Sequence, residues 1–146
     1  MYEDDDSIEN DYRKMPLYLK GEEIRDLVIQ ITDLISEDEP HLSHIKQFML
    51  EDAHIICVKI AGAEGGDLYD IRMECAAFIR RAANDLMVQN HTLEMFGFEH
   101  ANYYKLVRDL LEEYRVLFVV WVAGFDKWNY IPDSWGLFNP PGVNPE

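Results

Sequence analysis

Two pairs of side chains have the spacing of metal ligands. Glu51 and His54 form a Glu-x-x-His pair, which on a helix places a carboxylate and an imidazole on one face, as in ferritin-like bundles. His41 and His44 form a second pair, closely preceded by two glutamates, and imidazole with carboxylate suits several divalent metals. A ferritin-like site needs a second Glu-x-x-His pair and two more glutamates, whereas the chain has one such pair. We interpret both pairs as solvent-facing, and a metal-dependent enzyme using Glu51 and His54 is the least favoured function.

The two cysteines, Cys57 and Cys75, both lie in apolar stretches. A nucleophilic or redox-active thiol needs a base or a positive charge beside it. His54 lies three residues before Cys57, but the sequence indicates no third member of a catalytic group. A buried free cysteine behaves as a small hydrophobic residue, so we expect both to belong to a core. The sequence therefore predicts no catalytic residue and no cofactor.

Four basic residues are candidates for contact with nucleic acid: Arg72, Arg80, Arg81 and Lys105. Acidic residues at helical neighbour spacing, such as Glu74 and Asp85, offer them ion pairs within the protein. The chain carries a net charge of -15, and non-specific affinity for nucleic acid comes mainly from Lys and Arg against phosphate. Nucleic-acid binding is therefore the alternative rather than the leading interpretation.

The negative charge is concentrated near the start of the chain. Residues 1–39 hold 13 acidic and 4 basic residues, a net charge of -9, whereas residues 40–124 have a net charge of -4. We expect residues 1–16 to form an acidic, flexible arm without the basic and apolar regions of a secretory signal. The longest apolar run, Val116–Ala123, is far shorter than the roughly 20 residues of a membrane-spanning helix. These features predict a cytoplasmic protein that does not bind membranes.

Apolar residues recur at intervals of three and four over four segments, which predicts helices over about 20–35, 41–63, 67–91 and 102–124. Short connections between them favour an all-α, antiparallel up-down four-helix bundle over residues 17–124. Residues 125–146 contain four prolines and many aromatic residues, so an ordered, extended, non-helical segment packed on the bundle or on a neighbouring subunit is expected there.

The apolar stripes of the last two helices decide which faces should be buried. For 67–91 the spacing selects Leu68, Ile71, Cys75, Phe78, Ala82 and Leu86. For 102–124 it selects Leu106, Leu110, Leu117, Val120 and Trp121, with Tyr103, Val107 and Tyr114 near by. The run 116–123 is apolar around most of the helix, more than one stripe of a bundle can bury.

These additional apolar side chains must be shielded from water, either by the aromatic C-terminal segment or by another subunit. We therefore expect a homo-oligomer with an interface drawn from Phe118, Trp121, Val122, Trp128, Trp135 and Phe138. The sequence predicts a non-enzymatic interaction scaffold whose partner is a second copy of itself and whose biochemical role the residues do not specify.

The segment Lys59–Gly65, followed by a helix with alanines and arginines, resembles the four-helix-bundle family encoded in intervening sequences of bacterial 23S ribosomal RNA genes. That family carries an Asn-Ile-Ala-Glu-Gly-like turn; here Lys59 stands for the Asn, and Gly62-Ala63 separates the two halves. The resemblance implies an up-down bundle, commonly a cyclic pentamer, of unestablished activity. Some members are thought to handle nucleic acid through basic surfaces, a feature from which this acidic chain departs.

Overall fold

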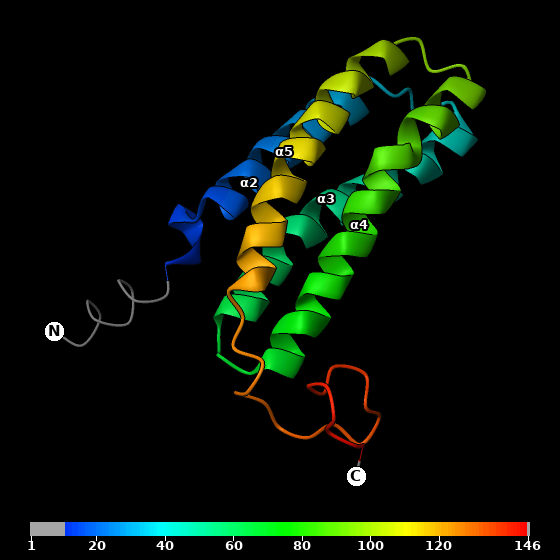
Figure 1. Ribbon diagram of the computed structural model, residues 1–146. Coiled ribbons are helices and arrows are strands. Elements are labelled where there is room, and N and C mark those ends of the chain that lie inside the picture. The colour runs from blue at the N-terminus through cyan, green and yellow to red at the C-terminus, as the bar shows by residue number, and fades with distance from the viewer. Residues whose placement is uncertain (1–10, 146) are drawn as a thin grey trace, which may run out of the picture.

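The computed structural model describes residues 11–145, and within them it contains four α-helices and no β-strand. The helices are α2 (Pro16–Thr32), α3 (Pro40–Glu64), α4 (Tyr69–Met95) and α5 (Tyr104–Ala123), with short 3-10 turns η1 (Tyr12–Lys14) and η2 (Ala101–Tyr103). The helices run side by side as a bundle, and the C-terminal segment gathers at the end where α5 finishes (Figure 1). The predicted all-α four-helix fold is confirmed.

Local sequence explains where the helices begin and how they are joined. Pro16 and Pro40 each occupy the first turn of a helix, where the missing N–H is not needed and the fixed φ favours helix. Only residues 65–68 separate α3 from α4, so these helices must pack side by side, and their contact is the most extensive in the bundle. Contacts of α2 with α3 and α5 are intermediate, and the contact between α4 and α5 is the loosest of the four.

The core is built from aliphatic residues of all four helices and from two buried tyrosines. Tyr114 donates its hydroxyl to the carbonyl oxygen of Ile56 on α3, with an O···O distance of 2.7 Å, and Tyr104 donates to that of Leu86 on α4. Burial raises the pKa of both phenols, so they stay neutral donors. The fully buried aliphatic residues around them are Ile24, Val28, Met49, Ile56, Ile60, Ile79, Leu86, Leu93 and Val107.

Several helix boundaries and faces differ from those expected. α2 begins at Pro16 rather than near residue 20, and Met15 just before it packs against the core. Residues 1–10 of the expected acidic arm lie outside the described residues. α4 continues to Met95, four residues beyond the expected end. The expected connection 92–102 is therefore shorter than the sequence indicated.

The predicted stripe of α4 is wrong in its first half. Ile71 and Phe78 are 47% and 46% exposed, whereas Ala76 and Ile79 are buried. The small side chains at Ala76 and Ala82 let α3 approach α4 closely. The close packing of this alanine face stabilises the bundle more than burial of the larger Ile71 and Phe78 side chains would. Phe78 instead lies beneath the Lys59 ammonium, 4.9 Å from its ring centre.

The predicted stripe of α5 is wrong in part, because Leu110, Leu117 and Trp121 pack against the core but two other members do not. Leu106 and Val120 are exposed, and the buried face is Tyr104, Val107, Leu111 and Tyr114. A buried tyrosine needs a hydrogen-bond partner, and in this orientation both hydroxyls donate to a helix carbonyl. The hydrogen bonds of these two tyrosines therefore hold this face of α5 against α3 and α4.

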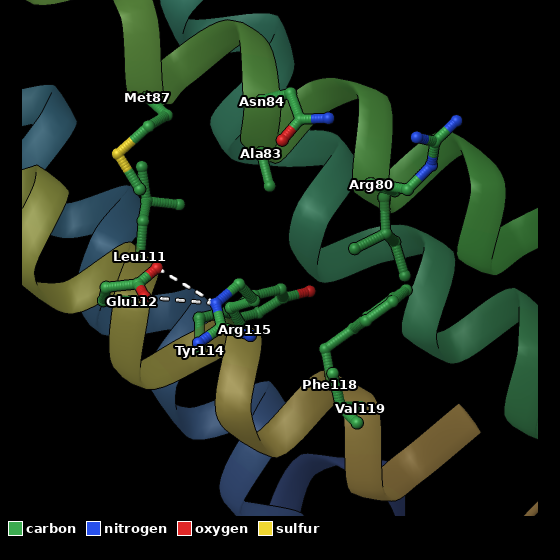
Figure 2. Close-up of a pocket in the computed structure, with 11 residues that line it drawn as sticks. Arg80, Ala83, Asn84, Met87, Leu111, Glu112, Tyr114, Arg115, Phe118 and Val119 are labelled. Atoms are coloured by element: carbon green, nitrogen blue, oxygen red, sulfur yellow. Dashed lines mark hydrogen bonds and ion pairs between the residues drawn. The ribbon is translucent and has the colours of Figure 1, made fainter. Parts of the chain in front are cut away.

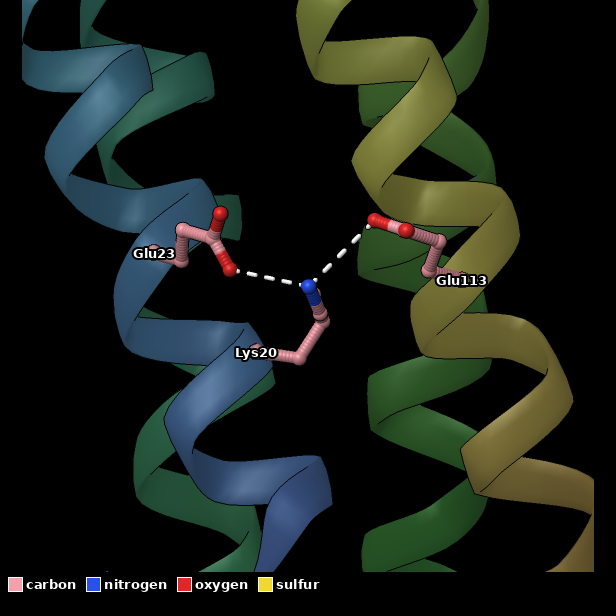
Figure 3. Close-up of polar contacts among 3 residues, drawn as sticks. All are labelled: Lys20, Glu23 and Glu113. Carbon is pink, nitrogen blue, oxygen red and sulfur yellow. Dashed lines mark hydrogen bonds and ion pairs between the residues drawn. The ribbon is translucent and has the colours of Figure 1, made fainter.

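An ion pair links α2 to α5 on the outside of the bundle. The Lys20 ammonium lies 2.9 Å from a carboxylate oxygen of Glu23 and 3.3 Å from one of Glu113 (Figure 3). The hydrogen bond to Glu23 is the main reason that the pKa of Lys20 is raised. Both carboxylates are more than half exposed, so this pair adds little stability.

A second polar cluster, here called the base cluster, lies where α3 ends and α4 begins. Glu64 Oε1 accepts hydrogen bonds from the Arg72 guanidinium and from the indole N–H of Trp121, each 2.7 Å long. Arg72 also stacks on Phe125, with its guanidinium carbon 4.1 Å from the ring centre, and Trp121 meets the same ring edge-on at 4.8 Å. The base cluster therefore ties α3, α4 and α5 together.

Candidate functional site

The outer face of α5 carries an apolar patch that no described residue covers. Val116, Val119 and Val120 are 55%, 55% and 71% exposed, and their spacing places them on one side of the helix. The patch belongs to the all-round apolar run recognised in the sequence. Exposed apolar side chains that cluster in this way are typical of interaction surfaces.

Beside this patch, α4 and α5 are separated by a groove of about 300 Å³. Its floor is apolar and includes Ile79, Ala83, Leu111 and Phe118. Figure 2 shows the side chains of α4 and α5 that line its two walls. The groove exists because the contact between α4 and α5 is the loosest in the bundle, and because Ala83 is too small to fill it. We call it the α4/α5 groove.

Charged side chains form the rim of the α4/α5 groove. On α5, both carboxylate oxygens of Glu112 accept from Arg115 Nε at 3.1 Å, as the dashed lines in Figure 2 mark. On α4, Arg80 is exposed and Asn84 lies one turn further along. Among residues 11–145, no carboxylate oxygen lies within 4.0 Å of a basic nitrogen of Arg80 or of its neighbour Arg81. Arg80 on the rim therefore has no ion pair within the described part of the chain.

The C-terminal segment is anchored to the start of α4. The carbonyl oxygen of Asn129 accepts from the amide of Tyr69 at 2.7 Å, and the Asn129 side chain donates to the carbonyl of Asp67 at 3.1 Å. These bonds fix the point at which the segment leaves the bundle. Further on, Leu137 and Phe138 lie beside the outer face of α4, where they line a cavity with Phe78.

A tight loop at residues 133–139 presents one tryptophan to solvent. The Asp133 backbone and the Asn139 side chain exchange two hydrogen bonds of 3.0 Å, and the Asp133 carboxylate accepts from the amide of Trp135 at 3.0 Å. Gly136 follows with φ of +71°, a conformation that favours glycine. Trp135 is 89% exposed, so hydrogen bonds of the loop, rather than packing, set its position.

The predicted interface residues fall into two groups. Trp128 and Trp135 are exposed, at 69% and 89%. Phe118 and Trp121 are half-buried: Phe118 lines the α4/α5 groove, and Trp121 belongs to the base cluster. The remaining two, Val122 and Phe138, are half-buried.

Other exposed apolar residues of α5 and the C-terminal segment were not predicted as part of the interface. They include Val116, Val119, Val120, Ile131 and Leu137. The all-round apolar run indicated a surplus, but apolar content alone does not say which side of the helix remains outside. The tyrosine hydroxyls were the signal that could have fixed the orientation.

The four basic residues proposed for nucleic acid do not form one surface. The Arg72 side chain is only 17% exposed and is held in the base cluster. Arg80 and Arg81 are exposed eight and nine residues further along α4, or about 12 Å along its axis. Lys105 is exposed at the start of α5, toward the opposite end of the bundle. Only Arg80 and Arg81 are adjacent and accessible.

The candidate metal ligands are dispersed. Glu51, His54, His41 and His44 are all exposed on α3, and the His41 ring stacks on Phe96 with ring centres 5.0 Å apart. Within residues 11–145 no group of three or more His, Cys, Asp or Glu side chains is placed to hold a metal ion.

Of the two cysteines expected in the core, only Cys57 belongs to it. Cys57 is buried and Cys75 is half-buried. Burial raises the pKa of the Cys57 thiol to about 11, and burial also raises that of Cys75. A thiol with a raised pKa holds little reactive thiolate at neutral pH.

Among residues 11–145, Asp52 is the one carboxyl group whose pKa is raised to about 7. Burial is the main cause, the nearby Asp85 and Glu51 add to it, and Arg81 opposes it. The folded chain therefore holds a proton on Asp52 at pH values where the unfolded chain, with a pKa of 3.8, has lost it. Folding stability should fall as pH rises between these two values.

Asp52→Asn should remove this pH dependence. The neutral amide avoids burying a charge. We therefore expect the unfolding temperature of the variant to be about 4 °C above that of the wild-type chain at pH 8, and nearly the same as the wild type at pH 4. Thermal denaturation followed by circular dichroism across this range measures it. Asp109, an exposed aspartate on α5 that does not contribute to the Asp52 pKa, provides the control, because Asp109→Asn should change neither curve. Equal changes in unfolding temperature for the two variants would contradict the raised pKa of Asp52 as the source of the pH dependence.

None of the helices in residues 11–145 is both long and apolar enough to cross a membrane. Comparison of the chain with protein-family models, curated proteins and solved structures gives no match. The described residues offer three candidate binding features: the apolar patch of α5, the α4/α5 groove and the exposed tryptophans.

Proposed function

We propose that the chain is a non-enzymatic, cytoplasmic scaffold whose copies assemble through α5 and the C-terminal segment. The observation that carries the proposal is the exposed apolar patch of α5, Val116, Val119 and Val120. A helix of a solitary bundle has no need for apolar side chains on its outer face. A neighbouring copy would remove them from water.

The C-terminal segment supports the same proposal. Tryptophan is enriched among the residues that dominate binding energy at protein interfaces, and Trp128 and Trp135 are more than two-thirds exposed. The hydrogen-bonded loop holds Trp135 in place before any partner arrives, which lowers the entropic cost of association. The resemblance to the intervening-sequence family favours a ring of five copies.

Val120→Asp and Trp135→Ser should each weaken self-association at least tenfold without unfolding the chain. Both side chains are more than 70% exposed, so their loss removes contact between copies rather than core packing. Sedimentation velocity over a concentration series measures the change. Val58→Asp is a matched control, because Val58 is a 43% exposed valine on α3, the helix diagonally across from α5. An equal effect of the control would contradict the proposed interface.

Nucleic-acid binding is the second candidate, supported by the adjacent exposed residues Arg80 and Arg81. If it occurs, wild-type affinity should fall steeply as salt rises from about 50 to 200 mM, and Arg80→Glu with Arg81→Glu should abolish it. Gel-shift titration with double-stranded and single-stranded nucleic acid tests both kinds of ligand. Arg25→Glu, on α2, is the charge control. Absence of any shift at about 50 mM salt would overturn this candidate.

A further inference from the structure

We propose that residues 1–10 of a neighbouring copy, here called the acidic segment, bind in the α4/α5 groove with their carboxylates against Arg80 and Arg115. This inference rests on the proposed function, because the contact joins two copies. It assigns an occupant to a groove that the described residues leave open, and a role to the most acidic part of the sequence.

The α4/α5 groove offers both kinds of contact that such a segment needs. The groove has a volume of about 300 Å³ above its apolar floor, which is large enough for one or two medium-sized side chains. Its rim carries Arg80, which has no carboxylate partner among residues 11–145, and Arg115, whose side chain is 60% exposed beside Glu112. Arginine can pair with a carboxylate through two parallel hydrogen bonds, so an incoming acidic chain would find guanidinium donors at the rim.

The acidic segment is complementary in composition. It contains five acidic residues and no basic residue: Glu3, Asp4, Asp5, Asp6 and Glu9. Tyr2 and Ile8 flank the acidic run on either side, so a chain laid along the groove can place an apolar side chain on the floor while its carboxylates face the rim. Like charges on the two chains would oppose assembly of a protein with a net charge of -15, and this contact offsets part of that repulsion.

The position of Asp11 favours a neighbouring copy over the same chain. The chain enters the bundle through η1, which packs on α2 and α3, whereas the groove lies between the other two helices. Within one chain the segment would have to pass around a helix roughly 10–12 Å in diameter. Each extended residue covers only about 3.3–3.6 Å, so that detour would use up several of the residues that are meant to bind. A neighbouring copy requires no detour.

Charge reversal in the full-length chain tests the contact. The groove variant carries Arg80→Glu and Arg115→Glu, and the segment variant carries Asp4→Arg, Asp5→Arg and Asp6→Arg. Each variant alone should assemble at least tenfold more weakly than the wild type, since like charges then face one another. Mixing the two should restore assembly, because each supplies the complement of the other, and a chain with all five changes should assemble alone. Light scattering measures mass, and circular dichroism verifies that helix content is unchanged.

The outcomes separate this inference from the proposed function. Assembly of both variants at the wild-type mass would overturn the inference and leave self-association intact. Weak assembly that mixing does not restore would overturn it as well, because the segment would then act within its own chain or away from these arginines. A matched control with Arg25→Glu and Lys46→Glu, on α2 and α3, should assemble normally. A wild-type chain that is monomeric would instead refute the proposed function.

Discussion

Glu64→Leu is expected to lower the free energy of unfolding by about 3 kcal/mol. Glu64 is the only acceptor that the base cluster provides for both the Arg72 guanidinium and the Trp121 indole N–H. The Arg72 and Glu64 side chains are 17% and 23% exposed, so water reaches them poorly. Loss of the carboxylate would leave a largely buried cation and a buried donor without a partner, which costs more than the pair itself contributes.

Two further variants make this prediction specific. Glu64→Gln retains an oxygen that can accept from Trp121 but removes the charge opposite Arg72, so we expect roughly half the loss. Glu112→Leu breaks another Glu–Arg pair, but its partners are about 60% exposed, and the expected loss is below about 1 kcal/mol. Urea denaturation of the three variants provides the comparison. Equal losses for Glu64→Leu and Glu112→Leu would contradict a structural role for the base cluster.

Gly21→Leu is expected to destabilise the chain by about 3 kcal/mol, despite the higher helix propensity of leucine. A Cβ at Gly21 would lie 3.3 Å from both the Ile56 carbonyl oxygen and the Cys57 sulfur, and 3.4 Å from the Tyr114 ring. The same carbonyl oxygen accepts the hydrogen bond of Tyr114. Neither the backbone nor the tyrosine can move without losing this bond, so α2 would be forced away from the core.

Gly62→Leu provides the matched control for Gly21→Leu. Gly62 is also within a helix, but it is exposed, and a Cβ there would meet only the Cys75 sulfur, at an ordinary 3.5 Å. We expect Gly62→Leu to be neutral or to stabilise the chain by up to about 1 kcal/mol, since glycine is a poor helix former. Thermal denaturation of both variants tests the pair. A similar stability for the two would show that space at Gly21 is not limiting.

The sequence predicted the parts of the fold that depend on strong periodicity. On α3 the apolar positions Ile45, Met49, Ile56 and Ile60 are buried as expected, because polar residues separate them on every turn. The start of α2 was missed although Pro16 is a favourable first residue, since the acidic residues Glu22 and Glu23 suggested a later beginning. The position of the proline therefore indicates the start of this helix better than the positions of the acidic residues do.

The candidate site was only partly predictable for a physical reason. In the run 116–123 almost every residue is apolar, so periodicity cannot tell the buried face of α5 from the exposed one. The observed face is instead held by contacts with distant residues, among them the hydrogen bonds of Tyr104 and Tyr114. Similarly, the aromatic content of residues 125–138 indicated order, but the bonds that expose Trp135 join Asp133 to Asn139, which no repeating pattern reveals.

The central claim, that the protein is a self-assembling scaffold, is tested most directly by the mass of the full-length wild-type chain in solution. Light scattering coupled to size exclusion, at roughly 1 to 100 μM protein, should give several times the monomer mass of 17.1 kDa. A mass of one chain over the whole concentration range would contradict the account.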